Sequence, residues 1–114
     1  MTDKDRVILH KIIRYATEAM DYISGFGFED FLSDNKTVSA CAFIVGQIGE
    51  LSSHISEGAR AAHANIPWRS IRGMRNKLVH DYDNVDMAVL WGTISKSMPE
   101  LINQLEALTA PPSY

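Results

Sequence analysis

The chain has 114 residues and only one cysteine, Cys41. A single cysteine forms no disulfide within the chain and supplies no cysteine-cluster metal site, so a reducing compartment is the simplest setting. Its neighbours in "SACAF" are small or apolar, which indicates a thiol packed in the core rather than a reactive one. A metal enzyme is also disfavoured because no two histidines are paired at i, i+4, and we expect no metal and no cofactor. The four histidines are His10, His54, His63 and His80.

Long apolar runs are missing as well. No run approaches the roughly 20 residues that span a bilayer, and the amino terminus "MTDKDRVILH" is charged at once, unlike a signal peptide. We therefore expect a cytoplasmic protein without a membrane partner. The content of 46% hydrophobic and 22% charged residues is typical of one compact domain. We predict that this domain spans residues 1–109 and that 110–114 form a flexible tail.

Strand-like alternation is absent too, and apolar residues recur at helical spacing. The segment "TDKDRVILHKIIRYATEAMDYIS" predicts a first helix, with Thr2 or Asp3 as its cap and Gly25 as its stop. A second long helix can be capped by Thr37, and its apolar stripe is continuous enough to predict one helix. That stripe consists of Val38, Cys41, Val45, Ile48, Leu51, Ile55, Ala59 and Ala62.

The remaining elements are also predicted to be helical. One short helical turn is expected at residues 28–32. Pro67 suits the first turn of a third helix that runs to residue 80 or 81. Asp86 can cap a last helix, in which Pro99 lacks a backbone donor and predicts a kink. The prediction is an all-α bundle of four main helices plus a short turn.

Acidic residues are missing from one stretch, Gly58 to His80, although the net charge of the chain is −3. A positive surface on an acidic protein suits an anion bound at one place, such as a nucleic-acid phosphate. Chance variation of charge along helices is the alternative interpretation. The positive residues of the stretch are Arg60, Arg69, Arg72, Arg75 and Lys77.

Within that stretch, "RGMRNKLVHDY" has two predicted faces. On a helix turning about 100° per residue, Asn76 and His80 share one side with Arg69 and Gly73. The opposite side is apolar and should anchor the helix. It carries Ile71, Met74 and Leu78.

Arg75 is harder to place, because five helical steps put it about 140° from His80, at the edge of the apolar stripe. Its guanidinium can reach around the helix, or it can pair with Glu50 inside the bundle. His80 and Tyr82 also have purely structural interpretations, at the helix end and in packing against it.

The residue types of this run permit a definite chemistry. A histidine that titrates near neutrality exchanges a proton, and an arginine stabilises negative charge developing on a phosphate. With the RNA 2′-hydroxyl as internal nucleophile, His80 and Arg75 would suffice for strand cleavage without a metal. Asn76 could orient His80 or bind a phosphate oxygen, and a symmetric dimer would bring two such sets together.

The run "RNKLVHDY" resembles the R-N-x-x-x-H-x-Y motif of the HepT-like toxins in the HEPN superfamily. The similarity extends over almost the whole chain, including "IGELSSHIS", "IPWRSIRGMRNKLVH" and "VDMAVLWGTISKSMPELINQLEAL". The resemblance implies a helical homodimer that cleaves cellular RNA, tRNA or mRNA, without a metal.

The resemblance also implies roles for individual residues. Arg75 and His80 would be catalytic, Asn76 would support them, and Arg72 and Lys77 of the basic stretch would contact RNA. Tyr82 would be adenylylated by a minimal nucleotidyltransferase (MNT) antitoxin, which blocks the cleft. The chain would then be the toxin of a type VII (HepT/MNT) toxin–antitoxin system.

Two alternatives remain. The chain could be a non-catalytic module that binds a nucleotide or substrate for a nucleotidyltransferase, or a dimer whose motif only stabilises the fold.

Overall fold

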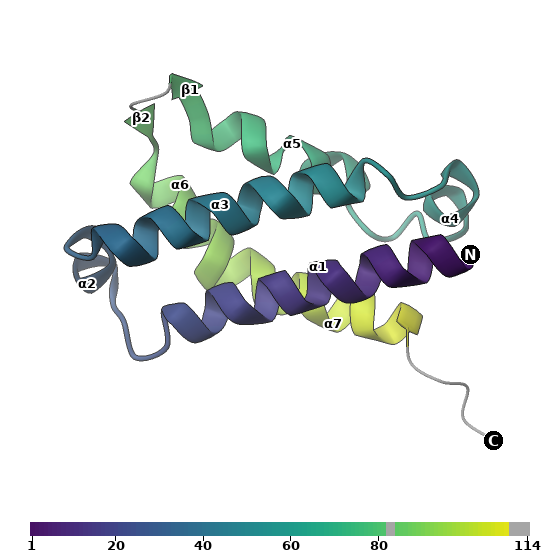
Figure 1. The fold of residues 1–114 in the computed structure, drawn as a ribbon, viewed down its shortest axis with the longest axis horizontal. Coiled ribbons are helices and arrows are strands. Elements are labelled where there is room, and N and C mark those ends of the chain that lie inside the picture. Colours follow the sequence, from purple (N-terminus) through teal and green to yellow (C-terminus); the bar gives the residue numbers. More distant parts are fainter. Residues whose placement is uncertain (82–83, 110–114) are drawn as a thin grey trace.

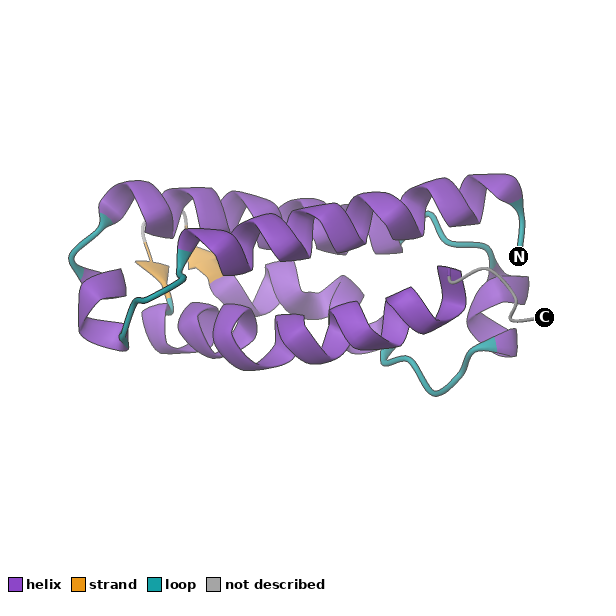
Figure 2. Ribbon diagram, turned by 90° about the horizontal axis from the view of Figure 1, so that it is seen from below, coloured by secondary structure: helices purple, strands orange, loops and turns teal. Residues whose placement is uncertain are grey.

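Four long helical segments make up most of the molecule in the computed structural model, which describes residues 1–81 and 84–109. Helix α1 packs against both α3 and α7, and α5 packs against α3 (Figures 1 and 2). The elements in chain order are α1 (Asp3–Tyr22), α2 (Phe28–Leu32), α3 (Asn35–Ser52), α4 (Glu57–Ala62), α5 (Trp68–Leu78), β1 (Val79–Asp81), β2 (Asn84–Val85), α6 (Met87–Gly92), the π-helical turn η1 (Thr93–Ser97) and α7 (Met98–Thr109).

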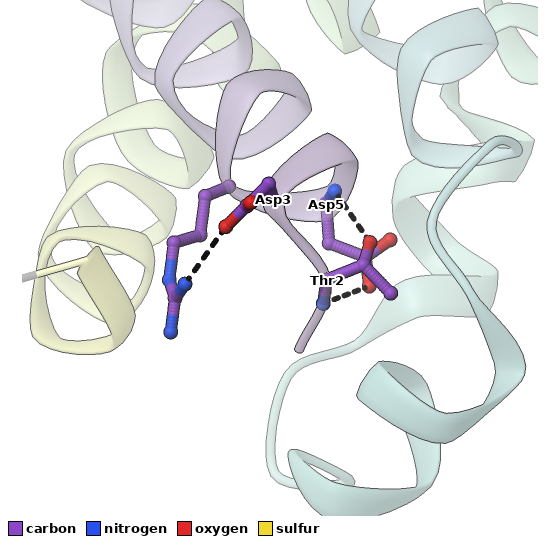
Figure 3. Close-up of polar contacts among 4 residues, drawn as sticks. Thr2, Asp3 and Asp5 are labelled. Atoms are coloured by element: carbon purple, nitrogen blue, oxygen red, sulfur yellow. Dashed lines mark hydrogen bonds and ion pairs between the residues drawn. The ribbon is translucent and has the colours of Figure 1, made fainter.

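Helix α1 begins and ends where the sequence predicts. Thr2 Oγ1 accepts the Asp5 backbone N–H at 3.0 Å, and the Asp5 carboxylate accepts the Thr2 N–H at 3.1 Å, which forms a capping box (Figure 3). Of the two predicted caps, Thr2 is the one used. Gly25 follows the helix with a φ of 80°, a left-handed conformation that favours glycine.

The second long helix differs from its prediction at both ends. Asp34, not Thr37, is the cap, because its carboxylate accepts the Thr37 backbone N–H at 3.1 Å. The helix also ends at Ser52 instead of continuing to Ala62. Ser56 starts the separate helix α4, and its hydroxyl accepts the Ala59 N–H at 3.2 Å.

The apolar stripe stays buried between α3 and α4, although the helix is interrupted there. Ile55 and Ala59 are both buried, as the apolar stripe predicted, while the backbone turns between them. Ser56 donates to the Asp5 carboxylate from its backbone N–H at 2.9 Å and from its hydroxyl at 2.6 Å. These bonds attach the start of α4 to the start of α1 and stabilise the break.

Helix α5 ends at Leu78, two to three residues before the predicted end. It starts just after Pro67, whose carbonyl accepts the Ile71 N–H at 3.0 Å. Residues 79–81 instead pair antiparallel with β2, Val79 opposite Val85. The expectation of no strands is therefore wrong at this point. β-Branched valines favour extended backbone, and strands of three and two residues are too short to show the alternation by which a strand is recognised in a sequence.

The last helical segment starts at its predicted cap, because Asp86 accepts the Val89 N–H at 3.1 Å. The sequence predicted a kink at Pro99, and the structure has a π-helical turn, η1, directly before α7, of which Pro99 is the second residue. The kink itself stays a prediction. Proline has no N–H for the carbonyl one turn earlier, and the Met98 N–H reaches back five residues to the Thr93 carbonyl.

The core lies between α1, α3 and the η1–α7 segment. The predicted stripes of the first and last helices are largely buried, and Phe31 of α2 closes one end against Trp91, with ring centroids 5.3 Å apart. The all-α fold class is thus confirmed apart from the short β1–β2 ladder. Over the described residues, no helix combines the length and apolarity needed to cross a bilayer. Buried core residues include Leu9, Ile12, Ala16, Ala19, Cys41, Val45, Ile48, Leu90, Ile94, Met98, Leu101 and Leu105.

Candidate functional site

An open groove of about 450 Å³ runs between α3 and α5. One wall is the α5 face predicted from helical spacing. The opposite wall comes from the C-terminal half of α3. The residues that line the groove are Arg69, Arg72, Gly73 and Asn76 of α5, Gly49 and Glu50 of α3, and Ser53 directly after α3.

The α5 wall has a simple origin in the sequence. Residues 69, 72, 73 and 76 follow i, i+3, i+4, i+7 spacing and so lie on one side of the helix. Ile71 on the other side is buried and Met74 is partly buried, which fixes how α5 is rotated against the core. A Cβ added at Gly73 would meet no atom within 4 Å, so this position leaves the groove open.

Charge on the α5 wall is positive. Arg69 and Arg72 are exposed, and in the part of the chain that the structure describes neither is paired with a carboxylate. Exposed guanidinium groups of this kind are available for phosphate oxygens.

The α3 wall contains a negative group. The Glu50 carboxylate lies 3.4 Å from His54 Nε2, one helical turn further on. The Ser53 hydroxyl donates to the Glu50 backbone carbonyl at 2.6 Å. The groove is therefore two-sided, with guanidinium groups on α5 and a carboxylate on α3.

The predicted site residues are distributed as follows. Arg72 and Asn76 are exposed and line the groove together with Arg69 and Gly73, as helical spacing predicts. His80 was expected on the same helix face but belongs to strand β1, beyond the end of α5. The predicted angle of about 140° between Arg75 and His80 assumed one continuous helix. It does not apply, because α5 ends at Leu78.

Other predictions at the motif are not tested. Arg75 and Lys77 belong to the backbone of α5, but their side chains, like that of His80, lie outside the described part of the structure. Tyr82 lies outside the described residues altogether. The pairing of Glu50 with Arg75 stays a hypothesis.

A metal centre finds no support among the described residues. No group of three or more histidine, cysteine, aspartate or glutamate side chains is arranged there to hold an ion. Cys41 is fully buried, as predicted, and burial raises the pKa of its thiol to about 11, which keeps it protonated.

Sequence reasoning missed the α3 wall of the groove. Glu50 was considered only as a partner for Arg75, and Gly49 and Ser53 were not singled out. Their spacing of three to four residues on α3 was visible, but it becomes informative only once α3 and α5 are known to be neighbours.

The chain matches the family described as Ribonuclease HepT-like over residues 12–108, a span that includes the groove and the whole of "RNKLVHDY". The chain belongs to this HepT-like ribonuclease family. No solved structure gave a match.

Two proteins illustrate the relationship. The chain is 41% identical over 95 residues to "Probable ribonuclease HepT" of Thermococcus cleftensis, covering 80% of this chain and 86% of that protein. It is 33% identical over 103 residues to a protein named "Putative RNase" from Caldanaerobacter subterraneus subsp. tengcongensis, covering 90% and 92%.

Proposed function

We propose that this chain is a metal-independent endoribonuclease and the toxin of a type VII (HepT/MNT) toxin–antitoxin system. The observation that carries the proposal is membership of the HepT-like ribonuclease family over residues 12–108, with the motif intact. Further support comes from the exposed Arg69 and Arg72 of the α5 wall, close to that motif in the sequence, which pair with no carboxylate of the described residues.

The proposed chemistry uses the RNA 2′-hydroxyl as nucleophile. His80 removes its proton or protonates the leaving 5′-oxygen, and Arg75 stabilises the negative charge that develops on the phosphate. Asn76 orients His80 or binds a phosphate oxygen, and Arg72 and Lys77 hold the strand. In a symmetric homodimer the second copy supplies the second histidine, so that one acts as base and the other as acid.

Inhibition would act at Tyr82. An MNT-type nucleotidyltransferase would transfer an adenylyl group from ATP to its hydroxyl and release pyrophosphate, which would add phosphate beside Arg75 and His80. Any further adenylyl group would be attached to the first one. Those phosphates would compete with RNA for the same positive charge and space.

The proposal is tested by incubating the purified protein with total RNA in EDTA. We expect cleavage by the wild type, and a loss of about a hundredfold or more for Arg75→Ala and for His80→Ala, because each removes a group that acts on the reacting phosphate. Gel electrophoresis of the RNA gives the rates.

Matched controls on α1 are Arg14→Ala and His10→Ala, which remove the same residue types from exposed positions and should cleave like the wild type. Light scattering and melting curves check that each variant keeps its assembly and fold. Equal cleavage by the wild type, Arg75→Ala and His80→Ala would refute the catalytic assignment. A large drop in melting temperature for Arg75→Ala would favour the structural role.

Modification of Tyr82 is tested by mass spectrometry of protein made with and without a co-produced MNT-type nucleotidyltransferase. We expect a mass increase of one or more adenylyl groups only in the co-produced sample, located on Tyr82 by peptide fragmentation. Tyr22→Phe, at an exposed tyrosine of α1, should keep the increase, and Tyr82→Phe should lose it. An unchanged mass on co-production would contradict this mode of inhibition.

The same purified proteins also test the alternative of a non-catalytic binding module. This alternative predicts binding of a nucleotide or of the nucleotidyltransferase, with no RNA cleavage at any protein concentration.

A further inference from the structure

The groove between α3 and α5 extends beyond the residues that the proposed reaction uses. Of the two arginines that line the groove, Arg69 is the one farther along the sequence from the motif, six residues before Arg75. The proposed cleavage reaction gives Arg69 no role. Its exposed guanidinium nevertheless belongs to the same groove wall as Arg72 and Asn76.

The axial spacing of these arginines suits a nucleic-acid strand that winds partly around α5, because Arg72 and Arg69 are also rotated by about 60° and about 120° around the helix axis from Arg75. With a rise of about 1.5 Å per residue, Arg72 and Arg69 lie about 4.5 and about 9 Å along the helix axis from Arg75. A stacked strand advances about 3.4 Å per nucleotide. The arginines are thus spaced for phosphates about one and about two to three nucleotides from the one at Arg75.

The opposite wall restricts how a strand can lie. Glu50 places a carboxylate on α3, held near His54, and a carboxylate repels phosphate. Phosphates should therefore follow the α5 wall, while sugars and bases occupy the side toward α3.

We infer that the α3–α5 groove is a phosphate subsite for single-stranded RNA, in which Arg69 and Arg72 bind backbone phosphates that flank the scissile one. The strand then runs from the motif along α5 toward its amino-terminal end. This inference rests on the proposed function for the choice of RNA, and it adds a binding role for Arg69 and a substrate that extends beyond one nucleotide. Arg69 is a positioning residue and touches no reacting atom.

Binding measurements test the subsite separately from cleavage. The probes are fluorescein-labelled 2′-fluoro oligouridines, a dinucleotide and an octanucleotide, which lack the 2′-hydroxyl nucleophile and are not cleaved. Fluorescence anisotropy gives their Kd for the wild-type protein, Arg69→Ala and the α1 control Arg14→Ala, between about 50 and 200 mM salt.

We expect Arg69→Ala to bind the octanucleotide about three- to tenfold more weakly than the wild type. Its log–log salt slope should be smaller by about 0.7, the value for one phosphate contact on a single strand. Binding of the dinucleotide should change by less than about twofold, since the short probe does not need to reach Arg69. Arg14→Ala should resemble the wild type with both probes.

The subsite is refuted if Arg69→Ala binds the octanucleotide like the wild type, if it weakens both probes equally, or if Arg14→Ala has the same effect. The outcome is independent of catalysis. A wild-type protein that cleaves no RNA but shows the length-dependent loss at Arg69 keeps the subsite and loses the proposed function. A wild-type protein that cleaves RNA, but whose Arg69→Ala variant shows no length-dependent loss of binding, keeps the proposed function and loses the subsite.

Discussion

A single buried carboxylate, that of Asp5, connects two distant parts of the chain. It accepts the Thr2 N–H in the capping box of α1 and both donors of Ser56 at the start of α4. Burial by itself would raise the pKa of Asp5, but the hydrogen bonds from Ser56 and Thr2 outweigh it and hold this pKa well below its usual value. The ionised form is therefore stabilised by folding.

Replacing Asp5 by Asn should lower the free energy of unfolding by about 1 to 3 kcal/mol at neutral pH, because an amide accepts fewer of these donors and presents hydrogens to Ser56. Since folding depresses the pKa, the stabilisation by Asp5 is present above the unfolded-state pKa and is lost as the pH falls below about 5 toward the folded value. Urea denaturation from pH 7 down to about pH 3 measures both effects.

Asp3→Asn is the matched control. Asp3 lies two residues before Asp5 on the same helix, but its side chain is fully exposed and, among the described residues, pairs only with Arg6, at 3.3 Å (Figure 3). This variant should keep the wild-type stability and its pH dependence. A similar loss for Asp3→Asn and Asp5→Asn would indicate a general effect of helix charge instead of the buried hydrogen bonds.

At the scale of elements, helix starts were predictable where the sequence offered one or two capping side chains, Asp86 for the last helix and Thr2 or Asp3 for the first. Thr2 and Asp86 each precede an apolar periodic segment and act as caps. At α3 the run "SDNKT" offers several capping residues. Asp34 is the cap instead of Thr37, and this depends on the path of the backbone between α2 and α3.

This choice can be tested by mutation. Asp34→Ala should destabilise the protein by about 1 kcal/mol, because the Thr37 N–H loses its acceptor. Thr37→Ala keeps that N–H and introduces a better helix former, so its melting temperature should be nearly unchanged. The reverse order of melting temperatures would identify Thr37 as the functional cap.

Helix ends were less predictable than starts. The apolar stripe of the second long segment continues through Ile55 and Ala59, yet the helix stops at Ser52 because Ser56 is held by Asp5 from another part of the chain. The end of α5 likewise depends on pairing with β2, which periodicity within one helix does not report.

At the scale of the molecule, the helical fold followed from periodicity because the stripes are long and their members largely buried. The candidate site followed only in part. One helix face, with Arg69, Arg72 and Asn76, could be derived from α5 alone, whereas the groove needs the packing of α5 on α3. Catalytic roles for Arg75 and His80 came from resemblance, because residue chemistry alone also allowed structural roles.

The arrangement separates the site from the main core. Helix α3 contacts α1 on one side and α5 on the other, and α5 lies at one edge of the ribbon in Figure 1. The groove is lined from α5 and from the end of α3, and none of the described residues of α1 or α7 lines it. Substitutions on the exposed α5 wall should therefore alter binding with little effect on stability.

The bond between Asp5 and Ser56 also bears on the order of folding. Its partners are 51 residues apart, and the chain between them includes α3, which packs against α1. Contacts that close so long a loop are favoured late in folding, since the entropy of closure must first be offset by helix pairing. The hydrogen bonds of Asp5 would then set the lifetime of the native state more than the rate at which it is reached.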